Sequence, residues 1–321
     1  MKVYLDLMKK IWETGTLKQN RTGIETKAIF GETLKFDLTK GFPMLTTKRI
    51  HTKSVIYELL WFLGNHMRDD RYKDLSMTNV KYLNDNGVTI WDEWCSPNGD
   101  LNKIYGYQWT RWEKFTEHED GTITKSHINQ IDQLINKLKN NPEDRRMIVM
   151  AWNPAQLDEM NLPPCHYGFQ VYSDPLDRLE RINLFNDHVK LYSLDITGMS
   201  VDDAMKYYNF PKRKLSLAYS QRSNDYFLGN PFNFASYSFL AHMLAEVTNH
   251  VAVEVTTFMG DVHLYVNHEP YINEILTREP RQLPKLKFKR KVTDIYDFKF
   301  EDFEIVDYNP YPNWKNVPIA V

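Results

Sequence analysis

Apolar side chains recur at helical spacing in four stretches of the chain. In the first of these, Tyr4, Leu7, Met8 and Ile11 share one face, and Gly15 ends the segment. A spacing of three or four residues brings side chains to the same side of a helix, so the pattern predicts amphipathic helices. By this criterion we expect helices over residues 4–11, 51–63, 128–138 and 237–247.

Other stretches show the pattern of β-strands. Leu34, Phe36 and Leu38 alternate with polar residues, which predicts a half-buried strand that stops at residues 41–43. A continuous apolar run is typical of a strand that is buried on both faces. Patterns of these two kinds predict further strands over residues 147–151, 166–172, 215–219 and 251–255.

Three polar segments interrupt these elements. We expect residues 66–85 to form a surface excursion and residues 112–127 to form a loop. Residues 173–214 are expected to be an irregular insert, in which Ser200 marks a possible helix start. The basic cluster 212–214 within it is interpreted as a solvated loop.

The charge of the chain is nearly balanced. Its 321 residues carry 40 Lys and Arg and 42 Asp and Glu, for a net charge of −2, and 42% of them are hydrophobic. This composition suits a globular core and gives no electrostatic reason to expect nucleic acid or an anionic membrane as a partner. No apolar run approaches the length of a membrane span, and charged residues interrupt the N-terminus. We expect a soluble, cytoplasmic protein.

Only two cysteines occur, Cys95 and Cys165, without the spacing of a disulfide framework or a structural zinc site. Cys165 follows Pro163 and Pro164, which fix the backbone ahead of the thiol. A lone cysteine is more often a small buried hydrophobe than a nucleophile. A protease-type pair with His166 is disfavoured, because side chains of adjacent strand residues diverge. If the thiol is reactive, an arginine is the more plausible activator.

Glu58 is the second candidate for chemistry. It lies within the apolar helix over 51–63 and shares a face with Val55 and Phe62. Burial there would raise the pKa of its carboxyl and make it a proton carrier near neutral pH, unless it is a solvated glutamate at the helix margin. Trp91 could be a core residue or a platform for a flat heterocycle, and Tyr105 a general base or a packing residue.

Phosphate binding would have to rely on arginines, because no glycine-rich phosphate loop is present. Arg21, Arg145, Arg146 and Arg222 are the candidates, although a surface ion pair is the commoner fate of a single arginine. Arg145 and Arg146 precede a strand, where neighbouring side chains face opposite ways, so they serve two sites or one site across an interface. His263 and Tyr265 share a strand face, but the histidines give only a weak indication of zinc, and we expect no metal.

These motifs occur together in the order that is found in thymidylate synthases. The chain resembles that family from Arg21 to Val321, with extra segments near residues 66–80 and 173–214. The resemblance rests on Arg21-Thr22-Gly23, Glu58-Leu59-Leu60-Trp61, Trp91-Asp92-Glu93-Trp94, Tyr105-Gly106, Arg145-Arg146, Pro164-Cys165-His166, Gln221-Arg222-Ser223, Pro231-Phe232-Asn233 and His263-Leu264-Tyr265.

The resemblance implies an α+β fold: one domain over residues 1–321, with a large mixed sheet that is packed with helices and forms the interface of a homodimer. It also implies reductive methylation of dUMP to dTMP, with 5,10-methylenetetrahydrofolate as donor of both the carbon and the hydride. Cys165 would add to C6 of the uracil, and Glu58, Tyr105 and His166 would handle protons. Arg222 would touch both the phosphate and Cys165 and lower the pKa of the thiol.

The same resemblance assigns the binding residues. The phosphate would be held by Arg21, Arg222 and Ser223, joined by Arg145 and Arg146 from the partner subunit. The rest of dUMP would be bound by Gln221, Asn224, Asp225, Asn233, His263 and Tyr265. Folate would lie against Ile90, Trp91, Leu228 and Phe232, with Lys48 and His51 near its glutamate end, Asp225 on the pterin and Ala320 in a closing tail.

Two alternatives remain at this point. Asn224 stands where many members of the family have a cysteine or another small residue, and Asn230 where many have leucine or valine. Arg-Ser-Asn-Asp over residues 222–225 also resembles the related pyrimidine hydroxymethylases, which would make 5-hydroxymethyl-dUMP instead. The other alternative is a non-catalytic nucleotide-binding or RNA-binding regulator that uses the basic cluster 212–214.

Overall fold

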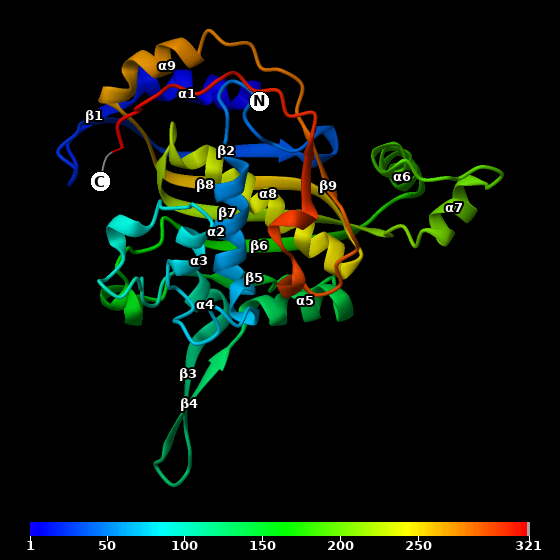
Figure 1. The fold of residues 1–321 in the computed structure, drawn as a ribbon, viewed down its shortest axis with the longest axis horizontal. Coiled ribbons are helices and arrows are strands. Elements are labelled where there is room, and N and C mark those ends of the chain that lie inside the picture. Colours follow the sequence, from blue (N-terminus) through cyan, green and yellow to red (C-terminus); the bar gives the residue numbers. More distant parts are fainter. Residues whose placement is uncertain (320–321) are drawn as a thin grey trace.

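A six-stranded mixed sheet forms the centre of the protein in the computed structural model, which describes residues 1–319 (Figure 1). The strand order is β1-β2-β8-β7-β6-β5, and all neighbours are antiparallel except the parallel pair of β7 and β8. The strands are β1 (Thr16–Lys18), β2 (Thr26–Asp37), β5 (Ile148–Met150), β6 (His166–Pro175), β7 (Arg213–Asp225) and β8 (Val251–Tyr265).

Helices cover one face of this sheet. The central helix α8 packs on β7 and β8 and is almost wholly buried, and α2 packs against α8. Figure 1 shows α1 and α9 along the β1–β2 edge of the sheet and α5 near β5. The helices are α1 (Lys2–Thr14), α2 (Thr52–Leu63), α3 (Lys81–Asp85), α4 (Tyr105–Arg111), α5 (Gln130–Asn140), α6 (Arg178–Tyr192), α7 (Val201–Tyr207), α8 (Gly229–Thr248) and α9 (Glu269–Ile275).

The two faces of the sheet differ in burial. Alternate strand residues such as Leu217, Tyr219 and Val255 are at most 1% exposed beneath α8. On the opposite face Tyr172 and Phe258 are 52% and 49% exposed, although both are large and apolar. The α+β class and the large mixed sheet packed with helices are thus confirmed, and the sheet has one uncovered face.

The expectation of a loop over residues 112–127 is wrong. This segment is a hairpin of β3 (Trp112–Glu117) and β4 (Ile123–Ile128), which projects from the body (Figure 1). Its charged residues hid the alternation, because both faces of most of the hairpin are solvated. A second small sheet joins β9 (Lys285–Phe288) to β10 (Phe303–Val306).

The segment 173–214 is more ordered than expected. It contains α6 and α7, whose apolar faces enclose a small core of Phe185, Ala204, Met205 and Phe210, all at most 6% exposed. Asp177 and Glu180 form a capping box at the start of α6, and Ser200 caps α7 as predicted. The expectation of an irregular insert is wrong. Both helices bury few residues, Phe185 in α6 and Ala204 and Met205 in α7, so their apolar pattern in the sequence is weak.

Two smaller expectations also change. Residues 66–85 lie less on the surface than predicted, since Tyr72 and Leu83 are at most 1% exposed. Helix α8 begins earlier than the predicted start at residue 237, and residues 229–233 are its first residues. Pro231 fits there, because a proline near the start of a helix removes only an amide that has no partner within the helix.

Gly106 lies where α4 meets α2, and it gives the first testable prediction. A Cβ at this position would lie 2.6 Å from the backbone oxygen of Phe62, a contact with rigid backbone that only displacement of a helix can relieve. We expect Gly106→Ala to lower the free energy of unfolding by roughly 1–3 kcal/mol, the usual effect of overpacking a core.

Urea denaturation monitored by circular dichroism measures this difference. Gly229→Ala is the matched control, because its added Cβ would meet only the Cβ of Asp225, at 3.7 Å. Equal stability of the two variants would show that α4 is not packed as closely on α2 as the structure has it.

Candidate active site

Cys165 lies directly before β6 and is held from two sides. Its backbone amide donates a hydrogen bond of 2.8 Å to the hydroxyl of Tyr105 on α4, and its carbonyl accepts one of 2.9 Å from the amide of Arg222 on β7. The guanidinium of Arg222 donates to the carbonyls of Pro164 and Pro163, at 2.8 and 2.9 Å. The same guanidinium comes within 4.0 Å of the Cys165 sulfur. The thiol is therefore fixed beside a positive charge.

Burial and charge act in opposite directions on this thiol. Burial raises the pKa of Cys165, and the positive charges of Arg222 and Arg21 lower it, with burial the larger effect. Arg222 thus acts in the direction the family resemblance implies, but the net pKa of the thiol lies above its ordinary value. The sulfur carries its proton at neutral pH and must lose it before it can attack.

Glu58 is enclosed as the sequence predicted. Its carboxylate accepts a hydrogen bond of 2.7 Å from the indole nitrogen of Trp91, and burial raises the pKa of Glu58 to about 7 although this bond opposes the shift. A carboxyl with that pKa exists in both protonation states near neutral pH, which suits proton transfer. The alternative of a solvated glutamate at the helix margin is wrong.

A column of aromatic rings connects this part of the site to α8. The imidazole of His166 stacks on Tyr105 with ring centroids 4.2 Å apart, and its Nδ1 lies 2.8 Å from the hydroxyl of Tyr237. Burial lowers the pKa of His166 to about 3, so the ring is neutral, and burial raises the pKa of Tyr105 well above its ordinary value. Both groups act as neutral hydrogen-bonding partners rather than as charges.

The end of β7 carries a set of buried amides. Gln221 and Asn224 are at most 2% exposed, and the Asn224 amide donates to the Gln221 side-chain oxygen at 2.6 Å. Asp225 accepts hydrogen bonds from the backbone amides of Phe227 and Leu228 at 3.1 and 2.9 Å, which fixes the turn into α8. Ser223 is half-buried on the same strand, and Asn233 is half-buried in the first turns of α8.

The neighbouring strand β8 brings two further predicted residues, His263 and Tyr265, to the end of β7. Asp225 and His263 are partners in the parallel pairing of β7 and β8, and the amide of Tyr226 donates to the carbonyl of His263 at 2.9 Å. The rings of His263 and Tyr265 lie 5.4 Å apart on one side of the strand, and His263 is bonded to Asp261. Arg21 is exposed in the loop before β2.

Arg145 and Arg146 are not brought to Cys165. Both are exposed just before β5, and the side-chain amide of Gln170 donates to the Arg145 carbonyl at 3.2 Å. Gln170 lies five residues beyond Cys165 along the extended strand β6, so this chain places the pair away from its own thiol.

The residues expected to bind folate differ widely in their solvent exposure. Trp91 is 8% exposed among other aromatic rings, Ile90 is 55% exposed, and Leu228 and Phe232 are partly buried. His51 is exposed and bonded to Ser54. Lys48 is only 4% exposed and donates to the carbonyl of Phe227, and burial lowers its pKa to about 8. Ala320 lies outside the described residues.

Two residues of the site were missed from the sequence. Tyr237, the partner of His166, is one of several apolar side chains on a helix face, and its periodicity indicates only core packing. Trp152 lies under the Arg222 guanidinium, 5.5 Å from the ring centroid. No local pattern marks either residue, because each acts through a partner that is distant in the sequence.

Two further properties of the described chain concern metals and membranes. Over residues 1–319, His, Cys, Asp and Glu side chains form no group of three that could hold a metal ion. Within the same residues, none of the helices has the length and apolar character needed to cross a bilayer.

The fold and the site define an α+β protein with a fixed thiol, a neighbouring guanidinium and an enclosed carboxyl. Comparison with families of known proteins gives a match to thymidylate synthase over residues 2–321. The match covers essentially the whole chain, and the protein belongs to the thymidylate synthase family. Membership implies a methyltransferase-type enzyme and a reaction that uses methylenetetrahydrofolate.

The raised pKa of Glu58 gives a prediction for stability. Below pH 4.5 the carboxyl is protonated in both the folded and the unfolded chain, and between 4.5 and about 7 only the unfolded chain ionises freely. Burial of Glu58 therefore lowers the free energy of unfolding increasingly as the pH rises through this range, by at most about 1.4 kcal/mol for each pH unit between these two limits.

Glu58→Gln removes this penalty. We expect the variant to match the parent protein near pH 4.5 and to exceed its stability by about 1–3 kcal/mol at pH 8, measured by urea denaturation across the range. Glu93→Gln, a change at an exposed glutamate, should show no such trend. A constant difference between Glu58→Gln and the parent at every pH would contradict the raised pKa.

Proposed function

We propose that the protein is a thymidylate synthase, which converts dUMP to dTMP with 5,10-methylenetetrahydrofolate as carbon and hydride donor. The observation that supports this proposal most strongly is the arrangement around Cys165. Its sulfur lies 4.0 Å from the Arg222 guanidinium. Glu58, whose pKa is about 7, is hydrogen-bonded to Trp91. Trp91 in turn packs on Tyr105, which holds the Cys165 amide.

In this proposal the Cys165 sulfur adds to C6 of the uracil, which makes C5 nucleophilic towards the one-carbon unit. Splitting the substitution into addition and elimination lowers the barrier of each step. The folate supplies the methylene group and then a hydride, and is oxidised to dihydrofolate. Elimination of the sulfur from C6 releases dTMP and restores the thiol.

The residues around the thiol divide the remaining work. Glu58 exchanges protons with the pyrimidine, because its raised pKa lets it hold or release a proton near pH 7. Tyr105 aids removal of the C5 proton while it holds the Cys165 amide, and His166, a neutral ring, orders the hydrogen bonds around them. Arg222 attracts the phosphate and stabilises the thiolate.

Binding is assigned to the ends of β7 and β8. Arg21, Arg222 and Ser223 would hold the phosphate, and His263 and Tyr265 the ribose hydroxyl. Asn233 would read the pyrimidine edge, since its amide can both donate and accept, with Gln221, Asn224 and Asp225 beside it. Folate would lie against Trp91, with the remaining contacts from Ile90, Leu228, Phe232 and His51. We place this activity in the cytoplasm, where two unpaired cysteines are ordinary.

Buried polar atoms of Asn224 and Asn230 support a second candidate product, 5-hydroxymethyl-dUMP. Both side-chain polar atoms of Asn230 and the side-chain oxygen of Asn224 are buried without a hydrogen-bond partner. Buried groups of this kind are usually satisfied by ordered water. Water near the site would favour hydroxymethylation over hydride transfer, so a dUMP hydroxymethylase is the alternative.

The product of the reaction distinguishes the two activities. A synthase forms dTMP and dihydrofolate in equal amounts, so the absorbance of dihydrofolate should rise in step with a nucleotide of dTMP mass. Formation of 5-hydroxymethyl-dUMP without dihydrofolate would contradict the proposal. Cys165→Ser should abolish either reaction, whereas Cys95→Ser, at the other free cysteine, should retain it.

We further propose a homodimer in which Arg145 and Arg146 complete the site of the partner subunit. The support is that both are exposed and lie away from Cys165 of their own chain. Mixing inactive Cys165→Ala and Arg146→Glu proteins should then restore activity, because a mixed dimer has one site in which neither change is present. Statistical reassortment of equal amounts gives about a quarter of the parent activity, since half of the dimers are mixed and each has one intact site.

The matched control pairs Cys165→Ala with Glu58→Gln. Both residues belong to one chain's site, so every site of that mixed dimer has a defect and no activity should return. If mixed dimers form but the Arg146→Glu combination remains inactive, the arginine acts within its own subunit.

A further inference from the structure

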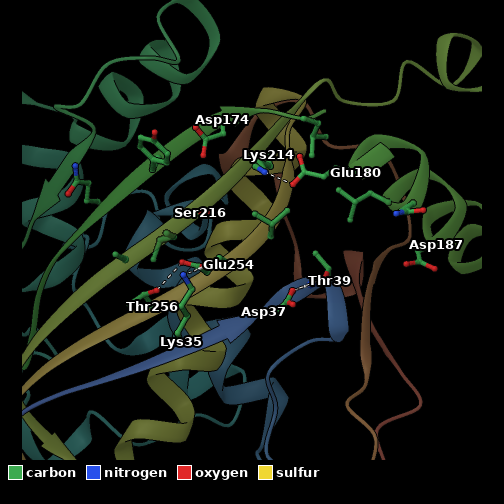
Figure 2. Close-up of a pocket in the computed structure, with 18 of the residues that line it drawn as sticks. Lys35, Asp37, Thr39, Asp174, Glu180, Asp187, Lys214, Ser216, Glu254 and Thr256 are labelled. Atoms are coloured by element: carbon green, nitrogen blue, oxygen red, sulfur yellow. Dashed lines mark hydrogen bonds and ion pairs between the residues drawn. The ribbon is translucent and has the colours of Figure 1, made fainter. Parts of the chain in front are cut away.

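Lys48 is held differently from the lysines at the surface of the sheet. In the groove beside α6, for example, Lys35 forms an ion pair of 2.6 Å with Glu254, as Figure 2 shows. Lys48, by contrast, is only 4% exposed, and its amine donates to a backbone oxygen, the carbonyl of Phe227. The positive charge of Lys48 therefore lies inside the protein and is bonded to the main chain.

Burial of this amine is unfavourable by itself and is offset in part by its neighbours. Loss of hydration lowers the pKa of Lys48 to about 8, although the negative charge of Asp225 opposes the shift. The amine lies over the ring of Phe227, 4.4 Å from the centroid, which adds a cation–π contact. A lysine that served only to meet a solvated anion would keep its strongly hydrated amine in water. The enclosed position indicates a role within the fold.

The carbonyl that Lys48 bonds belongs to the turn over residues 226–228, which joins β7 to α8. At the start of a helix such a carbonyl accepts from the amide four residues later. That residue is Pro231, which has no N–H. A buried carbonyl without a donor is unfavourable, so the Lys48 amine supplies the hydrogen bond that the proline cannot make.

Asp225 and Lys48 together fix both kinds of backbone group in this turn. The Asp225 carboxylate accepts hydrogen bonds from the amides of Phe227 and Leu228, at 3.1 and 2.9 Å, while Lys48 bonds the Phe227 carbonyl. Phe227 is fully buried, and its ring packs on Trp314 with centroids 5.8 Å apart. The turn thus depends on a donor that comes from a distant segment of the chain.

The segment that carries Lys48 is itself fixed. The carbonyl of Thr46 accepts a hydrogen bond from the amide of Tyr311 at 2.7 Å, and the carbonyl of Thr47 accepts one from the Arg278 guanidinium at 2.7 Å. Both threonines are fully buried. The Lys48 side chain therefore starts from a rigid base, and its amine can hold the turn in one place.

We propose that Lys48 is a positioning residue for folate, which holds the turn before α8 in the conformation that receives the pterin end. This inference rests on the proposed function, which places folate against Leu228, and on the family resemblance, which places the pterin on Asp225. The resemblance also puts Lys48 near the glutamate end of folate. The enclosed amine is unsuited to that contact, because it would have to leave the Phe227 carbonyl to reach a solvated carboxylate.

Hydrogen–deuterium exchange of the purified full-length protein, without nucleotide or folate, tests the hold on the turn. Lys48→Met removes the donor but keeps a long apolar side chain. We expect the peptide over residues 224–230 to exchange several-fold faster in this variant than in the parent, because the turn opens more often. Lys48→Gln, whose shorter side chain ends before the carbonyl, takes its place if the methionine variant does not fold. Lys53→Met, at an exposed lysine in the first turn of α2, is the matched control and should exchange like the parent.

Steady-state kinetics with two forms of folate separates positioning from direct contact. We expect Lys48→Met to raise the KM of the monoglutamate and of the pentaglutamate of methylenetetrahydrofolate by the same factor, about three- to tenfold, the usual effect of one lost hydrogen bond. Lys53→Met should leave both KM values unchanged.

The outcomes distinguish the possible roles. A larger loss with the pentaglutamate would overturn the inference, because an ammonium group at the glutamate end gains attraction from each added carboxylate. Unchanged exchange of the turn in Lys48→Met would overturn it as well, whatever the kinetics. Absence of turnover in the parent protein would overturn the proposed function instead, and the exchange measurement, made without ligands, would still decide whether Lys48 holds the turn.

Discussion

The hydrogen bonds from Arg222 to the carbonyls of Pro163 and Pro164 are the constraint on which the site depends. Two prolines remove backbone donors and limit the conformations of the segment before β6, so its carbonyls need partners from elsewhere in the chain. A guanidinium supplies several donors in one plane, which lets one side chain bond both carbonyls and still lie 4.0 Å from the Cys165 sulfur. Strand β7 thereby positions both the nucleophile and its counter-charge.

Burial sets the protonation states of the remaining groups. The same cause raises the pKa of Glu58 and of the Cys165 thiol and lowers the pKa of His166, because a low-dielectric surrounding disfavours whichever form is charged. As a result the Cys165 thiol and the His166 ring are neutral, and Glu58 can take up or release a proton near neutral pH. Aromatic packing of Trp91, Tyr105 and Tyr237 is what excludes solvent there, so the core and the chemistry share residues.

The uncovered face of the sheet links the fold to assembly. One face is buried under α8, while the other carries half-exposed Tyr172 and Phe258 and is bordered by α6. An apolar surface of this kind is typical of an interaction site. In the proposed dimer it would bring Arg145 and Arg146 to the phosphate site of a second chain, which accounts for their position away from the thiol of their own chain.

The sequence by itself determined the elements and the chemistry that depends on local pattern. Helix α2, the burial of Glu58 on its apolar face, the strand that follows Cys165 and the cap at Ser200 all follow from spacing over a few residues. The resemblance to thymidylate synthases added the family, which the match over residues 2–321 confirms. By contrast, the hairpin over 112–128 and the two helices of the insert were not recognised, because their solvated faces weaken the apolar alternation.

Only the tertiary structure decided which distant residues meet. Three contacts join segments that are remote in the sequence: Tyr237 with His166, Trp152 with the Arg222 guanidinium, and Lys48 with the carbonyl of Phe227. The apolar periodicity predicts that such a side chain is buried, but it does not predict which residues the side chain contacts. The pKa of Cys165 shows the same limit: the sequence supplied the arginine that lowers it, and the fold supplied the larger desolvation that raises it.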